Sequence, residues 1–469
     1  MADEEFASIR EVHEGALFAS EKAGQVSATP PYQAITAGWT SLQETLWEIN
    51  DPSEDGCQPG PHVTAGPGCD STYCACPLGQ TKDERSLKDG AGPEAIVVGE
   101  ACGRLLMVTA TEKQGTAFVY DVTDPSSPNL LFVQHLSPAS EKKNPSVAYN
   151  DGTLGEVDPE SITFLSAADS PTGNAGVLFA GAWSGTLSIY EFTQADGSKC
   201  AAMSGRRLAS YTSFTTADAS AASASPTGMA LVSRAYVPYG KGTGYAFGMG
   251  AAEQVAYDPI EKIAYVASEK GYVNLVSYAN PSFPAVLDSM AIDLSSISGS
   301  LTDVDVCGGF LAVGVAASTK TDDGSVRVYS TAAAAGTAPA LKASYTAGPL
   351  PDMVAFNADC SKIATANEGE GVYSSGLTDP EGSVSILSRT APDWSTATVQ
   401  TVSFGSVATS DASLIAAGVH LPLPKNAMIY FDDYSAKFKD DLDFTAARAV
   451  YTPATQLEPE YVKWSADGS

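Results

Sequence analysis

One short pattern recurs along the chain and limits the folds that it can adopt. It consists of an acidic residue, any residue, and then a Val or Ile that opens an alternating apolar segment, as in PEAIVV, PESITF, AEQVAYD, TDVDV, PDMVAF and PEYVKW. We call the acids of this pattern the opening acids, and they are Glu94, Glu160, Glu253, Asp303, Asp352 and Glu460. The third and fourth intervals between them are 50 and 49 residues long, close to the roughly 40 to 50 residues of a four-stranded propeller blade. Insertions explain the longer intervals.

Two further apolar strands follow five of the six opening segments, and a Gly precedes the last strand of each set. An example is KIAYVASEKGYVNLVSY at residues 262–278. Alternation of Val, Ile, Tyr and Phe between Gly, Asp and Asn turns predicts strands joined as hairpins. A parallel sheet would need crossover connections of a dozen or more residues, usually helices, and none stands between these strands. The sequence therefore predicts an all-β fold, a β-propeller of six or seven blades.

The repeats divide the chain into parts of different character. Closure of the ring has two solutions: N-terminal strands complete the last blade, or the propeller is incomplete. The parts are 1–50, strands that complete a blade; 51–90, a Cys/Gly/Pro-rich insertion; 91–200, two blades; 201–247, a linker rich in Ala, Ser and Thr; and 248–469, three blades and the start of a further one.

The charge balance excludes several classes of partner. The chain has 26 Lys and Arg against 55 Asp and Glu, a formal net charge of -29. Such a surface repels nucleic acids and anionic membranes. No apolar run reaches the roughly 18 residues of a membrane span, and the first residues lack the basic and apolar regions of a signal peptide. We expect a soluble chain or one that has lost a targeting segment.

Eight cysteines, an even number, favour an oxidising compartment and disulfides. Four of them cluster around His62, and they are Cys57, Cys69, Cys74 and Cys76. Their spacing fits zinc knuckles poorly, so a disulfide-stapled loop is the better interpretation of the cluster. Cys307 and Cys360 follow the first strands of consecutive blades, where they either form a disulfide or remain buried thiols. Cys102 occupies the same repeat position as Cys360 and has no obvious partner in the sequence.

The opening acids are candidate metal ligands, because the first strand of each blade lines the central channel of a propeller. Carboxylates gathered at one mouth repel one another and raise one another's pKa unless a cation neutralises them. Ca²⁺ prefers such oxygen ligands. Two other interpretations stay open: the acids cap the strands by accepting backbone N–H bonds, or they belong to an active site.

A second group of acids lies in one loop region, and its members are Glu368, Glu370, Asp379 and Glu381. Carboxylates interspersed with Gly suit the flexible coordination of Ca²⁺, although turn chemistry also selects Asn, Asp and Gly. The acidic stretch at residues 151–158 allows the same two interpretations. Asp322, Asp323 and Gly324 fit a plain hairpin turn.

Several segments resemble the choice-of-anchor I domain family. GMGAAEQVAYDPIEKIAYVAS, GPLPDMVAFNADCSKIATANEGE and LEPEYVKWSADG are similar to its opening blades, whereas GPEAIVVGEACGRLLMVTATEKQGTAFVYDV and DPESITFLSAADSPTGNAGVLFAGAWSGTLSIYEF are similar to its closing blades. The resemblance implies a propeller and a relation to cell-surface glycoproteins of mineral-forming cells and to atypical secreted alkaline phosphatases. The order is permuted, since residues 6–193 resemble the end of the family and 205–469 its beginning. Either the chain is a circular permutant, or it spans the end of one propeller and the start of the next.

The sequence gives little support to catalysis. The chain has four histidines, and none stands beside a G-x-S-x-G elbow. Ser184 lies in AWSGT, which a hairpin turn explains. We therefore expect an extracellular or cell-surface structural or adhesive module that binds Ca²⁺. Its expected partners are other copies, assembled head to tail through open strand edges, or other matrix and surface proteins. The alternative function is a secreted metal-dependent phosphomonoesterase.

Overall fold

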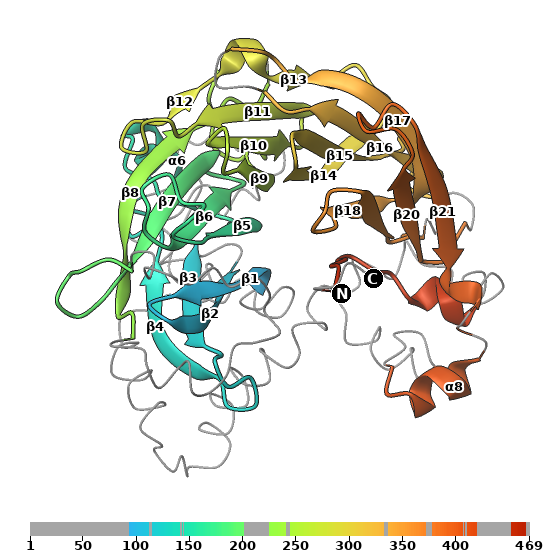
Figure 1. The fold of residues 1–469 in the computed structure, drawn as a ribbon, viewed down its shortest axis with the longest axis horizontal. Coiled ribbons are helices and arrows are strands. Elements are labelled where there is room, and N and C mark those ends of the chain that lie inside the picture. The colour runs from blue at the N-terminus through green and yellow to red at the C-terminus, as the bar shows by residue number, and fades with distance from the viewer. Residues whose placement is uncertain are drawn as a thin grey trace, which may run out of the picture. The chain divides into compact units, whose positions relative to one another are not determined.

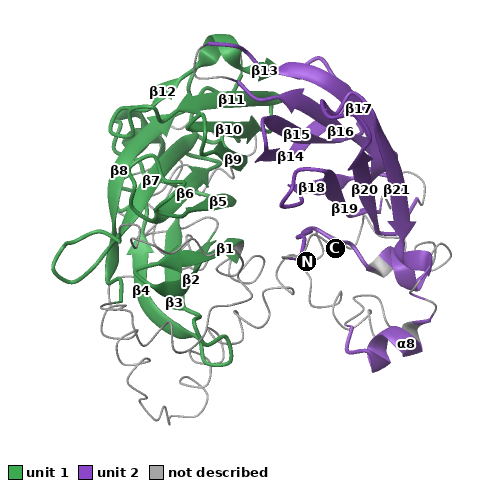
Figure 2. Cartoon of the chain, viewed as in Figure 1, with its two compact units in different colours: residues 1–293 green, residues 294–469 purple. Residues whose placement is uncertain are grey.

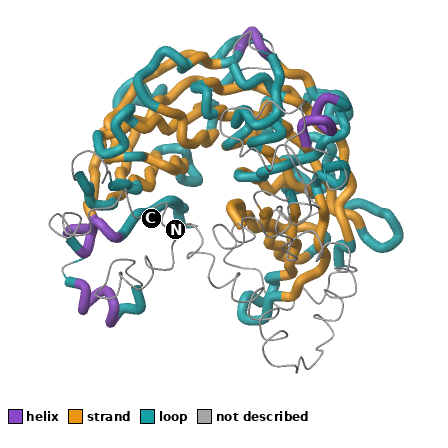
Figure 3. The backbone as a smooth tube through the Cα atoms, turned by 180° about the vertical axis from the view of Figure 1, so that it is seen from behind, coloured by secondary structure: helices purple, strands orange, loops and turns teal. Residues whose placement is uncertain are grey.

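A computed structural model of the chain describes residues 93–111, 115–140, 143, 145–200, 225–240, 244–332, 336–371, 378–406, 408, 410–419 and 452–465. The chain divides into two compact units, residues 1–293 and 294–469 (Figure 2). Strands are the predominant regular element of the described backbone, and the helices are few and short (Figure 3). The predictions for residues 1–50 and 51–90, including the four-cysteine cluster, lie outside the described residues. No helix in the described part of the chain is long and apolar enough to cross a membrane.

The first unit contains three antiparallel sheets, whose strands are labelled in Figure 1. The first sheet consists of β1 (Pro93–Ala101), β2 (Arg104–Thr111), β3 (Thr116–Asp121) and β4 (Asn129–His135). The second consists of β5 (Ser161–Leu165), β6 (Gly176–Gly181), β7 (Thr186–Thr193) and β8 (Gly228–Tyr236). Helix α6 (Pro145–Asn150) lies in the connection between these two sheets.

The third sheet of the first unit has one extra short strand. It consists of β9 (Gln254–Asp258), β10 (Ile263–Ser268), β11 (Tyr272–Ser277), β12 (Ala285–Val286) and β13 (Ile292–Asp293). Both β12 and β13 pair with β11, and the 3-10 helix η3 (Asp288–Met290) separates them along the chain.

The second unit contains two four-stranded antiparallel sheets. The first consists of β14 (Ser300–Cys307), β15 (Phe310–Ala316), β16 (Asp323–Ser330) and β17 (Ala340–Pro349). The second consists of β18 (Pro351–Phe356), β19 (Lys362–Asn367), β20 (Ser383–Arg389) and β21 (Ala397–Ser403). Three short helices follow, namely η4 (Phe404–Ser406), α8 (Asp411–Ala416) and η5 (Pro453–Gln456). The all-β prediction is confirmed, and in every sheet the first four strands follow one another in chain order.

Successive sheets pack face to face through their first strands. Within the first unit β1 contacts β5 and β5 contacts β9, and within the second unit β14 contacts β18. Alternate side chains of a strand point to opposite faces, so each first strand supplies apolar groups to the sheet before it and to the sheet after it. Ile162 of β5, for example, belongs to the same buried cluster as Leu106 and Val108 of β2. The core therefore lies between the sheets.

Two disulfides join neighbouring sheets. Cys307 and Cys360 form a disulfide that links the ends of β14 and β18. Of the two predicted states, a disulfide or two buried thiols, the structure shows the disulfide. Cys102, for which the sequence offered no partner, bonds to Cys200 beyond the end of β7. The equivalence of Cys102 and Cys360 is visible in the backbone, because both have positive φ angles of 53° and 58° in the turn after a first strand.

The structure differs from the predicted linker at residues 201–247. Residues 228–236 form β8, which pairs along its length with β7. The Ala- and Ser-rich composition around this segment conceals a strand, because GMALVSRAY has few bulky apolar residues. Its outer position in the sheet leaves Leu231 45% exposed, so little apolar content is needed. Residues 201–224 lie outside the described part.

Candidate carboxylate sites at the starts of the first strands

Two of the opening acids, Glu94 and Asp352, lie where the first strand is irregular. In β18, Pro351 pairs with Asn367 and Met353 pairs with Ala366, so Asp352 is the extra residue of a β-bulge. Glu94 occupies the same place in β1, although its side chain lies outside the described structure. A bulge turns the extra side chain away from the regular alternation. The bulge therefore gives the opening acid a direction that strand geometry alone would not.

Two opening acids of the first unit meet in one cluster. The Glu253 side chain forms hydrogen bonds with the side chains of Glu160 and Glu269. Burial first, and then the charges of Asp158 and Glu269, raise the pKa of Glu253 to about 7. Two carboxyl groups form a hydrogen bond only when one of them carries a proton. Glu253 therefore keeps its proton at pH values at which an exposed glutamate has lost it.

Gly250 makes room for this first cluster. A Cβ atom at this position would lie 2.4 Å from Cδ of Glu269 and 2.6 Å from Oε1 of Glu253. Its φ angle of +55° is also one that favours glycine. The backbone fixes the neighbours, because Glu269 N donates to Gly250 O at 2.9 Å and Glu253 N donates to Ala267 O at 2.9 Å. A glycine here lets both carboxylates approach the backbone closely.

A second carboxylate cluster lies in the other unit. Burial and the charges of Asp352 and Glu370 raise the pKa of Glu368 to about 7, and Lys320 opposes this shift. Burial also raises the pKa of Glu458 to about 7, with contributions from Glu368, then Asp379 and Glu370. Lys320 forms an ion pair with Glu370. The structure thus brings together Asp352, Glu368, Glu370 and Asp379, all of which the sequence predicts as metal ligands.

The two clusters are built in the same way. Glu269 follows Glu253 by sixteen residues, and Glu368 follows Asp352 by sixteen residues. Antiparallel pairing of the first and second strands brings the end of the second strand beside the start of the first. The sequence analysis missed Glu269 and Glu458. An alignment of the repeats would have found Glu269, whereas Glu458 joins its cluster only through the fold.

Asp303 does not belong to either cluster. In β14 the repeat is shifted by one residue relative to the alignment of the sequence. Val304 is the residue equivalent to Val354, because both are buried and both pair with the second strand of their sheet, Val304 with Val313 and Val354 with Thr365. Thr302 consequently stands at the opening-acid position. Asp303 is 7% exposed and accepts a hydrogen bond from Val354 N at 2.9 Å. It therefore joins β14 to β18, as the capping interpretation of the opening acids expected.

Asp305 makes a second contact of this kind, since its Oδ2 accepts a hydrogen bond from Phe356 N at 2.7 Å. Burial raises the pKa of Asp303 to about 7, and the Asp305 charge adds to this shift. In the first unit, Ser161 takes the place of Asp303: its Oγ accepts a hydrogen bond from Val255 N at 3.0 Å. Both units therefore join consecutive first strands with a side-chain acceptor at the same register position.

The remaining predicted ligands have separate surroundings. Glu381 accepts hydrogen bonds from Ser403 Oγ and, at 3.4 Å, from Thr452 Oγ1. Gly405 packs against its carboxylate, which a Cβ atom there would contact at 2.1 Å. Glu381 thus ties the end of the β20–β21 hairpin to the segment around η5. Glu460 is partly buried within the final described segment, residues 452–465.

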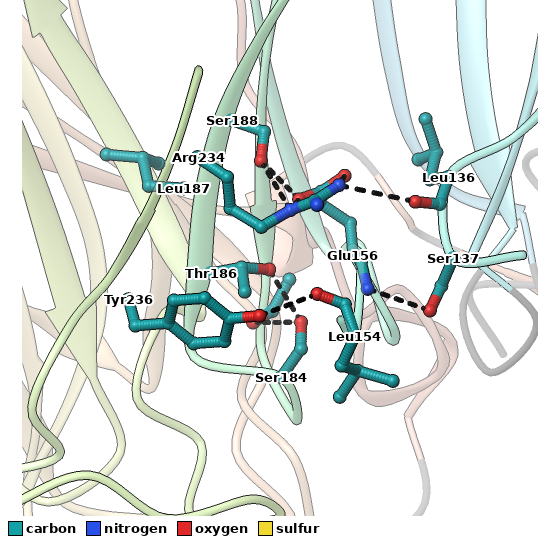
Figure 4. A network of polar contacts seen from close by, with 12 residues as sticks. Leu136, Ser137, Leu154, Glu156, Ser184, Thr186, Leu187, Ser188, Arg234 and Tyr236 are labelled. Carbon is teal, nitrogen blue, oxygen red and sulfur yellow. Dashed lines mark hydrogen bonds and ion pairs between the residues drawn. The ribbon is translucent and has the colours of Figure 1, made fainter. Parts of the chain in front are cut away.

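The acidic stretch at 151–158 uses its central acid in an ion pair (Figure 4). Glu156 is fully buried, and Arg234 of β8 contacts both of its oxygens, at 2.6 and 3.0 Å. Tyr190 Oη donates to Glu156 Oε2 at 2.9 Å, and Ser188 Oγ donates to Oε1. Burial raises the pKa of Tyr190 well above its usual value. These contacts satisfy the Glu156 carboxylate, so a structural role explains this acid without a bound metal.

The hairpin interpretations hold. Ser184 lies in the β6–β7 turn, where it is buried and its Oγ accepts a hydrogen bond from Val157 N at 3.1 Å. Asp322 lies in the β15–β16 connection, and its N–H donates to Thr319 O at 2.9 Å. Among the residues that the structure describes, no three side chains of His, Cys, Asp or Glu are arranged as a ready metal site.

Comparison with known families matches residues 76–125 and 253–469 to the choice-of-anchor I domain. The chain belongs to this family. The match confirms the resemblance that the repeat segments indicate, and it includes the opening acids of β1, β9 and β18.

Two curated proteins are similar over part of their length. The mesenchyme-specific cell surface glycoprotein of Strongylocentrotus purpuratus is 29% identical over 147 residues, which cover 30% of this chain and 18% of the glycoprotein. Gigasin-3a of Magallana gigas is 23% identical over 131 residues, which cover 28% of this chain and 46% of gigasin-3a. The chain thus spans less than half the length of either relative.

Among solved structures, Saccharomyces cerevisiae Sqt1 is similar to 66% of this chain and 60% of its own, with 11% identity and a TM-score of 0.34. This similarity is too low to assign the fold.

Proposed function

We propose that this chain is an extracellular or cell-surface β-propeller that acts as a Ca²⁺-binding structural or adhesive module. Within each unit, the sheets are formed by consecutive strands and pack through their first strands, which is the arrangement of propeller blades. Two disulfides support an oxidising compartment. The similarity to a cell-surface glycoprotein supports the same location.

The observation that carries the Ca²⁺ proposal is the pairing of an opening acid with a Glu sixteen residues later in both units. Around Glu253 and around Glu368, burial and neighbouring acids raise the pKa to about 7. A divalent cation replaces the proton of such a group and removes the repulsion between carboxylates. Ca²⁺ takes six to eight oxygens in flexible geometry. Because no ready site exists among the described residues, binding requires the carboxylates to rearrange around the ion.

Thermal unfolding at pH 7.5 with and without CaCl₂ tests this proposal. At a Ca²⁺ concentration of 100 Kd, binding to the folded state alone adds about 2.7 kcal/mol of stability. For units of this size each kcal/mol raises Tm by about 2 to 4 °C. Glu253→Gln and Glu368→Gln should each lower the Ca²⁺-dependent rise. Without Ca²⁺ the same variants should be as stable as the parent or more stable, since each removes a carboxylate whose charged form is disfavoured.

Asp322→Asn is the matched control, because it removes one exposed acid from a hairpin turn outside both clusters. It should leave the Ca²⁺-dependent rise unchanged. Equal responses of all three variants would mean that Ca²⁺ acts by screening the net charge, and no rise in the parent protein would refute Ca²⁺ binding.

A further inference from the structure

The backbone of the first unit is strained at one Asp–Pro bond. Asp158, which precedes Pro159, has a φ of +62°, a left-handed conformation that costs free energy in a residue with a Cβ atom. The following proline restricts the backbone of Asp158 further, because it favours extended conformations in the residue before it. Strained residues that a structure holds in place are concentrated at functional sites. Asp158 is therefore a candidate for chemistry of its own.

The preceding residues hold Asp158 in this conformation. Arg234 binds both carboxylate oxygens of Glu156, at 2.6 and 3.0 Å. Val157 N donates to Ser184 Oγ at 3.1 Å. Asp158 itself is fully buried. Because its neighbours are fixed by these contacts, the strain at Asp158 cannot relax by rotation of the chain before it.

Two backbone donors converge on the carbonyl oxygen of Asp158. Ala182 N donates to this oxygen at 2.8 Å, and Glu160 N donates to it at 3.0 Å. Ala182 is fully buried, and its own carbonyl accepts hydrogen bonds from Gly185 N and Ala251 N, so this donor is held in place. Fixed N–H groups at such distances form an oxyanion hole. They polarise the carbonyl carbon and stabilise the negative charge that develops on its oxygen when a nucleophile adds.

The nucleophile is the carboxylate of Asp158. It belongs to the same residue as the polarised carbonyl, and rotation about two side-chain bonds brings one of its oxygens onto the carbonyl carbon. An attacking group held in the same residue acts at a very high effective concentration. The turn is also within reach of water, since Glu160 is partly exposed.

Two other Asp–Pro bonds of the described chain lack these features. Neither Asp124 nor Asp258 has a positive φ angle. Their carboxylates are engaged in turns instead: Oδ1 of Asp124 accepts a hydrogen bond from Ser126 N at 3.0 Å, and Oδ1 of Asp258 accepts one from Ile260 N at 2.9 Å. These two bonds are references within the same molecule.

We propose that the folded chain cleaves its own peptide bond between Asp158 and Pro159. An oxygen of the Asp158 carboxylate attacks the carbonyl carbon of the same residue and closes a five-membered cyclic anhydride. The bond from this carbon to the Pro159 nitrogen breaks, and the nitrogen takes a proton from a water molecule. The hydroxide that remains opens the anhydride. Asp158 then ends in two carboxyl groups, Pro159 carries a new amino terminus, and one water has been consumed.

The disulfide between Cys102 and Cys200 gives this cleavage a particular outcome. Cys102 lies before the cleaved bond and Cys200 lies after it. The products, residues 1–158 and 159–469, therefore remain one covalent molecule. Cleavage releases the backbone strain at Asp158 while the disulfide keeps the first sheet attached to the second.

Electrophoresis of the purified full chain tests the proposal. The chain is incubated at pH 7.5 with protease inhibitors. It should run as a single species without reductant and as two fragments with it. The amino-terminal sequence of the larger fragment should read PESITF. The cleaved fraction should not depend on protein concentration, because the reaction is intramolecular, and the chain unfolded in urea should stay intact, because unfolding removes both donors.

Variants of the nucleophile supply the second arm. Asp158→Asn removes the carboxylate and keeps a residue type that tolerates positive φ angles, whereas Asp158→Gly removes the whole side chain. Both variants should give no fragments after reduction. The matched control is Asp258→Asn, which changes a reference Asp–Pro bond and should be cleaved as the parent is.

Three results would overturn the proposal: a parent chain that stays intact after reduction, equal cleavage before Pro125 or Pro259, or fragments from both Asp158 variants. If Asp158→Asn fails to fold, as judged by circular dichroism, Asp158→Gly and the terminus mapped in the parent decide. The proposal does not involve Ca²⁺. An uncleaved chain would leave Ca²⁺-dependent stabilisation unaffected, so the two proposals fail separately.

Discussion

At the scale of single residues, the surroundings of a carboxylate decide its role. Glu156 and Glu253 are both glutamates at the start of a sheet in the first unit. Glu156 meets Arg234, Tyr190 and Ser188, which satisfy its charge and its hydrogen bonds. The charged groups that interact with Glu253 are the acids Asp158, Glu160 and Glu269, and burial together with these acids raises its pKa to about 7. The first residue stabilises the fold, whereas the second is the kind of carboxylate that we propose a cation stabilises.

The buried ion pair gives a direct prediction. Arg234→Met should lower the free energy of unfolding by about 3 to 5 kcal/mol, because it leaves the buried Glu156 charge without its partner. Urea denaturation measures this loss. The control is Lys143→Met, which removes the exposed pair between Lys143 and Asp151 and should cost no more than about 1 kcal/mol. Equal losses in the two variants would show that the buried network contributes nothing special.

The Gly250 cradle gives a second prediction. Gly250→Ala should destabilise the first unit, because it adds a contact with Glu253 and Glu269 to an unfavourable backbone angle. Gly197→Ala is the control that separates steric contact from backbone strain. Gly197 has a φ of +81° and no atom within 4 Å of the added Cβ, so only the backbone strain remains. It should cost only the roughly 1 kcal/mol of a left-handed alanine, as measured by thermal unfolding. A Gly250 variant that costs no more than this control would mean that the carboxylates move aside freely.

At the scale of strands, side-chain acceptors on the first strands hold one sheet to the next. Backbone hydrogen bonds of a β-ladder join strands within a sheet. They leave without a partner those N–H groups of a first strand that point away from its own sheet. Ser161 and Asp303 satisfy such groups from the neighbouring strand. Burial raises the pKa of Asp303 to about 7, so above that pH Asp303 joins the strands at the cost of an unfavourable ionisation.

Substitution at Asp303 should separate these two effects. Asp303→Ala leaves the buried Val354 N–H without an acceptor and should cost about 1 to 3 kcal/mol. Asp303→Asn keeps an acceptor oxygen and removes the charge, so at pH 8 it should be at least as stable as the parent. Chemical denaturation at pH 8 measures both. An Asn variant as unstable as the Ala variant would show that Val354 requires the carboxylate charge itself.

At the scale of the whole molecule, acids dominate the electrostatics. The excess of Asp and Glu over Lys and Arg gives a net charge of -29, and several acids are held where their charged form is disfavoured. Burial raises the pKa to about 7 for Asp303, Glu368 and Glu458. Each of these groups keeps its proton in the folded chain at pH values where the unfolded chain has lost it.

The pH dependence of stability follows from this difference. A carboxyl group with a raised pKa stabilises the folded state below its unfolded pKa of about 4, and this contribution is lost as the pH rises through 7. The free energy of unfolding should therefore fall between pH 5 and pH 8, by roughly 2 kcal/mol or more in total. Exposed Asp196, Asp359 and Asp393 have lowered pKa values and titrate below this window.

Thermal unfolding at pH 5, 6.5 and 8 in a chelating buffer measures the effect. Ca²⁺ should restore part of the stability at pH 8 and little at pH 5, where protons occupy the clusters. A flat profile, or stability that rises from pH 5 to pH 8, would contradict the raised pKa values.

The sequence by itself determined the all-β class and the repetition of a three-strand unit along the chain. Alternating apolar residues between Gly and Asp turns are a local property, and they predicted the first three strands of each of the five described sheets, the family and the equivalence of Cys102 with Cys360. The tertiary structure decided the rest, because it depends on contacts between residues far apart in the chain. It made Thr302 the equivalent of an opening acid, gave Cys102 its partner Cys200, and turned residues 228–236 from a linker into β8. It also separated Asp303, which bonds a neighbouring strand, from Glu253 and Glu368, which meet other acids, since a carboxylate's partners are set by packing and leave no trace in the local pattern.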